Sequence, residues 1–153
     1  MINNDVLRSV RYMLKVNESK LIDIVKLAGG DVLLPDMISY LKREDEEGFK
    51  ACPQEVMSHF LDGLIIFKRG KDENRPPPPF ELPTNNVVLK KLRVAFELKD
   101  DDIVVFMEKS GLKVSKTEIS ALFRKFGHVN YRECGDQFLR QFLKGLTSRV
   151  RPD

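Results

Sequence analysis

The chain has 153 residues, of which 42% are hydrophobic and 32% are charged, and its formal net charge is +3. These proportions are typical of a globular protein and exclude wholesale disorder. No apolar run approaches the ~20 residues that a membrane-spanning helix needs, and the first residues lack the basic and apolar regions of a signal peptide. With 2 cysteines and no secretion signal, the composition predicts a cytoplasmic protein with reduced thiols and no membrane contact.

An internal repeat is the clearest pattern in the sequence. The string Asn3–Leu7 returns as Asn85–Leu89, and Phe60–Leu64 returns as Phe142–Leu146. Further matches lie between these strings in the same order, at an offset that falls from 82 to 81 residues and later returns to 82. We therefore predict a tandem duplication with three parts: a first helical repeat in residues 1–70, a proline-rich linker in residues 71–84 and a second helical repeat in residues 85–153.

The first two helices of each repeat are predicted from apolar residues that recur every three or four positions. Asn4 and its counterpart Asn86 are of a type that favours the N-cap, so we expect them to begin the first helix of each repeat. A second helix is expected after Asn17. It should end before Gly29, because glycine commonly closes a helix.

The third and fourth helices have start signals of their own. Ser115 and Glu118 form the pattern of a capping box and predict the third helix of the second repeat. The fourth helices are expected to start at Cys52 and at Cys134, since each cysteine is followed by apolar residues at helical spacing.

A glycine lies at the same position inside each predicted fourth helix, Gly63 in the first repeat and Gly145 in the second. Glycine in a helix interior costs about 1 kcal/mol relative to alanine. We therefore expect each missing Cβ to admit the close approach of another backbone. Both glycines are predicted at tight helix–helix crossings, one candidate place being the boundary between the two repeats.

The predicted fold class is all-α, with two tandem repeats of about four helices each, because no segment alternates polar and apolar residues as a half-buried strand does. A unit of ~70 residues is only marginally stable alone. We therefore expect the repeats to pack together with pseudo-twofold symmetry. Between them, the four prolines at 76–79 predict an extended linker, and a ligand for a proline-recognition domain is the alternative.

Five strings are specific enough to compare with known families: residues 3–12, 42–49, 68–71, 86–93 and 131–140. They resemble the YehS-like family of small bacterial proteins of unknown function, and the resemblance extends over nearly the whole chain. It implies a bacterial protein with a tandem repeat. It implies no activity, because the family has no established one, and so no catalytic residue is carried over.

Cys52 and Cys134 are the candidate reactive thiols. The dipole and free N–H groups at a helix N-terminus lower the pKa of a thiol. However, no histidine, asparagine or second cysteine lies nearby in the sequence to complete a site, so we favour a buried residue that closes the helix start. The chain also lacks metal-binding, phosphate-binding and nucleophile motifs. We therefore predict no catalytic residues, no metal and no cofactor.

Positive charge is concentrated in the second repeat, where residues 85–153 hold 14 basic and 9 acidic side chains. Arg11 and Arg93 are equivalent and lie at the edge of the first helix's apolar face, where an arginine bonds carbonyls and acids between helices or forms a paired anion site. The candidate anion or partner contacts are Arg11, Arg93, Arg124, Lys125, Arg132, Arg140 and Lys144.

Two functions remain open from the sequence. The leading hypothesis is a non-catalytic interaction protein with an unidentified protein partner. The alternative is a nucleic-acid-binding protein that uses the basic second repeat, where the second and third helices faintly resemble a helix-turn-helix with too long a turn. Neither the partner nor the oligomeric state follows from the sequence.

Overall fold

The computed structural model describes residues 1–152, and within this range the chain folds into eight helices and no strand. Before the linker these are α1 (Asn3–Leu14), α2 (Glu18–Leu27), α3 (Leu34–Tyr40) and α4 (Gln54–Arg69). After it come α5 (Asn85–Ala95), α6 (Asp100–Lys109), α7 (Lys116–Leu122) and α8 (Asp136–Val150). The predicted all-α class is confirmed. None of these helices is both long and apolar enough to cross a membrane.

The helix starts agree with the local sequence at α7 and differ from it at α1 and α5. Ser115 caps α7 within the predicted capping box. The prediction that Asn4 caps α1 is wrong, because the N-cap residue is Ile2 and Asn4 lies inside the first turn. In the same way Asn86 lies inside α5, and the side chain of Thr84 provides the cap. Both asparagines are buried instead and bond to a distant part of the chain.

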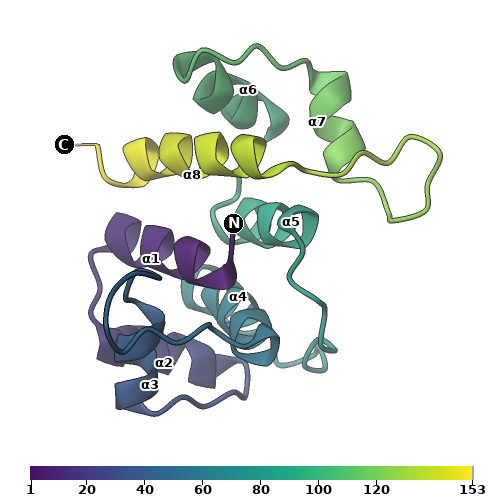
Figure 1. Ribbon diagram of the computed structural model, residues 1–153. Helices are drawn as coiled ribbons and strands as arrows, with labels where there is room; N and C mark the ends of the chain where they lie inside the picture. The colour runs from purple at the N-terminus through teal and green to yellow at the C-terminus, as the bar shows by residue number, and fades with distance from the viewer. Residues whose placement is uncertain (153) are drawn as a thin grey trace.

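The helices before and after the linker are interleaved. Within each half, α2 packs on α3 and α4, and α6 packs on α7 and α8. The first helix of each half, however, packs chiefly on the last helix of the other half: α1 lies against α8, and α5 lies against α4. Figure 1 shows α1 and α5 between α8 above and α4 below. Each half therefore supplies one helix to the packing of the other.

One hydrophobic core runs through both halves of the described chain. Its largest fully buried side chains come from both sides of the linker, among them Phe60 in α4 and Phe142 in α8. Burial of one such side chain stabilises the fold by about 1.5–3 kcal/mol. Sharing a core allows two units of marginal size to remain folded together.

Two arginines at the ends of the last helices hold the interleaved helices together. Arg69, at the end of α4, donates to the carbonyl oxygen of Val94 in α5 at 3.2 Å. Arg151, just after α8, donates to the carbonyl oxygen of Tyr12 in α1 at 3.0 Å and stacks on the ring of this tyrosine. The same kind of contact therefore fastens both boundaries between the halves.

Gly63 and Gly145 lie at tight helix crossings, as predicted. A Cβ at Gly63 would lie 1.9 Å from the carbonyl oxygen of Ile24 in α2, and a Cβ at Gly145 would lie 2.4 Å from the Cβ of Phe106 in α6. Both crossings are between helices of the same half. The suggestion that these crossings lie at the boundary between the halves is therefore wrong.

The linker forms no helix between α4 and α5, and its last part is attached to the helices. The backbone N–H of Glu81 donates to the hydroxyl of Ser58 in α4 at 3.4 Å, and the carboxylate of Glu81 pairs with Lys90 and Lys91 of α5. Lys91 also pairs with the buried carboxylate of Asp62 at 2.7 Å. This charged group lies at the boundary between α4 and α5.

Candidate functional site

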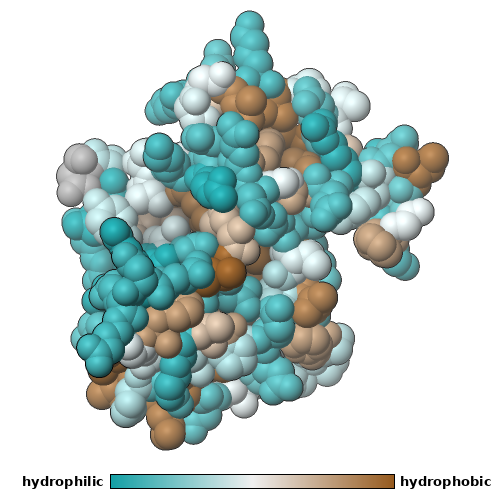
Figure 2. All heavy atoms as spheres, in the orientation of Figure 1, coloured by the Kyte–Doolittle hydropathy of each residue, from teal (hydrophilic) through white to brown (hydrophobic). Residues whose placement is uncertain are grey.

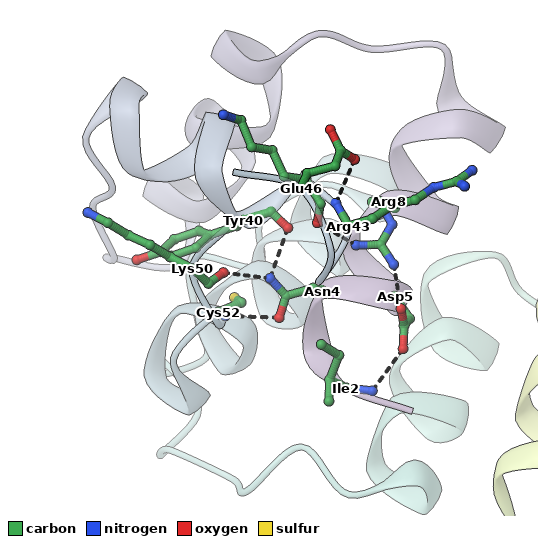
Figure 3. Close-up of polar contacts among 10 residues, drawn as sticks. Ile2, Asn4, Asp5, Arg8, Tyr40, Arg43, Glu46, Lys50 and Cys52 are labelled. Carbon is green, nitrogen blue, oxygen red and sulfur yellow. Dashed lines mark hydrogen bonds and ion pairs between the residues drawn. The ribbon is translucent and has the colours of Figure 1, made fainter. Parts of the chain in front are cut away.

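A buried asparagine on α1 holds the loop that joins α3 to α4 (Figure 3). The side-chain amide of Asn4 donates to the carbonyl oxygens of Tyr40 at 2.9 Å and Lys50 at 2.8 Å. Its carbonyl oxygen accepts the backbone N–H of Cys52 at 3.0 Å. Both amide hydrogens are used, so the side chain has no donor left for a ligand.

Asn86 on α5 makes the same three hydrogen bonds in the second half. It donates to the carbonyl oxygens of Leu122 at 3.0 Å and Arg132 at 2.9 Å, and it accepts the backbone N–H of Cys134 at 2.8 Å. We call these two groups the asparagine clamps. Each clamp fixes the loop before the last helix onto the first helix of the same half.

Cys52 and Cys134 lie beside the clamps, and both are buried. They precede the N-cap residues Pro53 and Gly135, so the helices start slightly later than predicted. Burial raises the pKa of each thiol to about 12, and the nearby carboxylate of Asp136 adds to the rise at Cys134. A reactive thiol needs exposure and a lowered pKa. Neither cysteine has this environment, which supports the structural interpretation.

We expect Cys52 and Cys134 to resist alkylation in the native protein. With a pKa of about 12, only about one thiol in 10,000 is a thiolate at pH 8. Mass spectrometry after iodoacetamide treatment should show labelling at least about 100-fold slower in buffer than in 8 M urea. Equally fast labelling of either cysteine in both solvents would contradict this expectation.

Arg11 and Arg93 lie where the first helix of each half meets the second. Arg11 pairs with Glu18 in the first turn of α2 at 3.1 Å, and Arg93 pairs with Asp100 in the first turn of α6 at 2.8 Å. The guanidinium of Arg93 also stacks on the ring of Phe123 at 4.4 Å from its centre. These carboxylates balance both charges, which supports a role between helices rather than an anion site.

The structure brings together only some of the other predicted cations. Arg124 and Lys125 lie in the loop between α7 and α8 and line one groove beside it. Arg132 pairs with a glutamate of α7 at 3.4 Å. Arg140 and Lys144 lie one turn apart on the exposed face of α8 and do not line this groove. These cations therefore do not form one group: two lie in the loop, one is paired with a glutamate, and two lie on α8.

The α7–α8 loop (residues 123–135) projects from the helical body (Figure 1). At its tip Phe126 is 85% exposed and Val129 is 91% exposed, and hydrophobic atoms are visible there in Figure 2. The ring of Phe126 packs edge-on against Tyr131, with 5.4 Å between the ring centres. Sequence reasoning missed this feature. The available signal was a pair of apolar residues in a loop, where they serve no helical face.

A groove of about 1020 Å³ lies between this loop, the start of α5 and the end of the linker. Phe123, Phe126 and Tyr131 contribute aromatic rings to its lining. Arg124 and Lys125 contribute positive charge, and neither forms an ion pair within residues 1–152. Lys90, Arg124 and Lys125 outnumber Glu81 and Glu133 in the lining, so the groove combines aromatic rings with a small excess of positive charge.

The α3–α4 loop (residues 41–53) takes the corresponding place in the first half. Its exposed acidic residues are Glu44, Asp45, Glu46 and Glu47. These four acidic residues outnumber Lys42, Arg43 and Lys50, so the net charge of this loop is −1. Residues 123–135 have a net charge of +2, because Arg124, Lys125 and Arg132 outnumber Glu133. Arg8 of α1 donates to the carbonyl oxygen of Lys42 at 2.8 Å and pairs with Asp5, so the start of the loop is held to α1 (Figure 3). The two clamped loops thus present opposite charges to solvent.

The α6–α7 segment does not have helix-turn-helix dimensions. Residues 110–115 separate the two helices, whereas the usual turn has about three or four residues. α7 has only 7 residues, and its first residue, Lys116, pairs with Asp101 at 2.7 Å. This geometry does not favour insertion of α7 into a DNA groove.

Comparisons with known proteins find relatives over nearly the whole chain. A family model described as "Protein of unknown function (DUF1456)" matches the chain over residues 3–70 and 85–151. The chain is 51% identical over 150 residues to "Uncharacterized protein YehS" of Escherichia coli (strain K12), which covers 97% of this chain and 96% of that protein. No solved structure matches the chain.

Proposed function

The chain belongs to the DUF1456 family of unknown function, in agreement with its resemblance to YehS-like proteins, and we propose that it is a non-catalytic interaction protein. The observation that carries this proposal is the exposure of Phe126 and Val129 at the tip of the projecting α7–α8 loop. Apolar side chains held away from the core are typical of a surface that a partner covers. The loop is the docking element, and the helical body positions it.

We also propose that the body arose by duplication of a four-helix unit and has pseudo-twofold symmetry. Three observations support this. The family model matches two separate segments of the chain, the two asparagine clamps make equivalent hydrogen bonds, and α1–α8 packing has a reciprocal counterpart in α4–α5 packing.

Nucleic-acid binding by the second half is the alternative function. Arg124 and Lys125 in the loop and Arg140 and Lys144 on α8 support it, because exposed cations neutralise phosphates. It is opposed by the long α6–α7 turn and by the position of Arg140 and Lys144 outside the groove that Arg124 and Lys125 line. A protein partner would cover the exposed apolar residues at the loop tip. Binding of nucleic-acid phosphates gives these residues no role.

A pull-down with a loop variant tests the proposed function. We expect proteins from an extract of the source cells to be retained by the wild-type chain and lost with the double substitution Phe126→Ser and Val129→Ser. Nuclease treatment should not change their retention. The control is Val105→Ser, which removes another exposed apolar side chain, on α6 and outside both clamped loops and the groove. The proposal would be contradicted if the loop variant retained the same proteins as the wild type, or if nuclease treatment abolished their retention.

A further inference from the structure

Two loops of opposite charge project their side chains without neutralising each other. In the α3–α4 loop, Glu44, Asp45 and Glu47 are exposed, and none of them forms an ion pair within the described part of the chain. In the α7–α8 loop, Arg124 and Lys125 are exposed and likewise lack a carboxylate partner there. Each loop therefore has the charge that the other would attract.

The ends of both loops are fixed before any partner arrives. The asparagine clamps hold them to α1 and α5 through three buried or partly buried hydrogen bonds each. Within the acidic loop, Lys42 binds the backbone carbonyl of Glu47, and the carboxylate of Glu46 accepts the backbone N–H of Arg43. A preformed loop loses less conformational freedom on binding, so a small contact can still be specific.

Apolar side chains accompany both charged groups. Phe126 follows the two cations directly in the basic loop, and Val129 lies three residues further on. On the acidic side, Leu34 and Ile38 lie one turn apart on α3, just before the loop in the chain, and are 47% and 43% exposed. The two loops therefore differ in the sign of their charge, and each has exposed apolar side chains beside its charged residues.

We propose that the protein associates with a second copy of itself, the α7–α8 loop of one copy docking on the α3–α4 loop of the other. This inference rests on the proposed function and names the partner of the same loop. Arg124 and Lys125 meet the acidic residues 44–47, while Phe126 and Val129 cover Leu34 and Ile38. Each copy has one loop of each kind, so every copy both offers and receives the contact.

The expected association is weak and depends on salt. A contact between two loops is smaller than the roughly 1,200–2,000 Å² of a stable interface. Exposed ion pairs are also screened at high ionic strength. We therefore expect the average mass of the wild-type chain to rise with concentration in 50 mM NaCl. The dissociation constant should be at least about tenfold larger in 500 mM NaCl.

Charge reversal with complementation tests the proposal by sedimentation velocity. The basic-loop variant carries Arg124→Glu and Lys125→Glu, and the acidic-loop variant carries Glu44→Lys and Asp45→Lys. Each variant alone should remain monomeric, because both of its loops then have the same sign. An equimolar mixture should associate again, since the unchanged loop of each variant finds the unchanged loop of the other. The matched control, Arg140→Glu with Lys144→Glu on α8, should associate like the wild type.

Three results would overturn the proposal: a monomeric wild type at all concentrations in low salt, a mixture that fails to associate, or an α8 control that loses association as fully as the loop variants. Circular dichroism should first show that every variant retains its helix content. A monomeric chain that still captures another protein through Phe126 and Val129 would overturn self-association and leave the proposed function standing. Loss of both would reject the two together.

Discussion

Replacing Asn4 with alanine is expected to lower the free energy of unfolding by about 3 kcal/mol. The substitution leaves the carbonyl oxygens of Tyr40 and Lys50 and the N–H of Cys52 without their partner in a largely buried place. Each unsatisfied buried group costs about 1–3 kcal/mol, and water that enters the space recovers part of this cost. Urea unfolding followed by circular dichroism measures the change. Asn86→Ala should have an effect of the same size.

Two companion variants separate hydrogen bonding from other effects. Asn4→Asp preserves the size and the acceptor for Cys52, but it turns a second oxygen toward two carbonyl oxygens, so it should not restore stability. Asn74→Ala, at an exposed position in the linker, should change the free energy of unfolding by less than about 0.5 kcal/mol. A loss below about 1 kcal/mol for Asn4→Ala would mean that the clamp does not hold the loop.

Gly63→Ala is expected to destabilise the protein by about 1–3 kcal/mol, although alanine is the better helix former by about 1 kcal/mol. The added methyl group would lie 1.9 Å from the carbonyl oxygen of Ile24, so α2 must move away from α4. Backbone cannot rotate aside as a flexible side chain can. Gly145→Ala should also destabilise, because its nearest neighbours are the Cβ and ring of Phe106 and then its Cα.

The control for the glycine experiment is Gly135→Ala. A Cβ at Gly135 would meet no atom within 4 Å, and its φ of −76° suits alanine. Its effect should therefore stay within about 1 kcal/mol, measured by the same urea titration. A higher melting temperature for Gly63→Ala than for the wild type would show that the α2–α4 crossing is looser than described.

The sequence was informative wherever the signal was local or repeated. The capping box at Ser115, the all-α class and the need for close packing at Gly63 and Gly145 all follow from short-range rules of helix formation. Asn4 shows the limit of such rules. Its residue type favours an N-cap, but its hydrogen-bond partners lie 36, 46 and 48 residues away in the chain, and tertiary bonds override the local preference.

The candidate site was less accessible to sequence reasoning. The dipole argument for Cys52 and Cys134 considered only the helix start, whereas burial beneath the clamped loops raises the pKa of both thiols. Charge counts made nucleic-acid binding by the basic second repeat the alternative function, but Arg124 lines the groove beside the loop and Arg140 does not. The exposure of Phe126 depends on where the loop projects, which no periodic pattern in the sequence encodes.

The interleaved packing makes the two halves unlike partners on one chain. The linker keeps them close together, and its Glu81 joins the charged group at the α4–α5 boundary. The two boundaries between the halves are chemically different. Asp62 meets Lys91 between α4 and α5, whereas the matching sequence positions on α8 and α1 hold Lys144 and Ser9. Two copies of the second half would set Lys144 against Lys91, and two copies of the first would leave Asp62 buried opposite a serine. We therefore expect charge to favour contact between the two unlike halves over contact between two copies of one half.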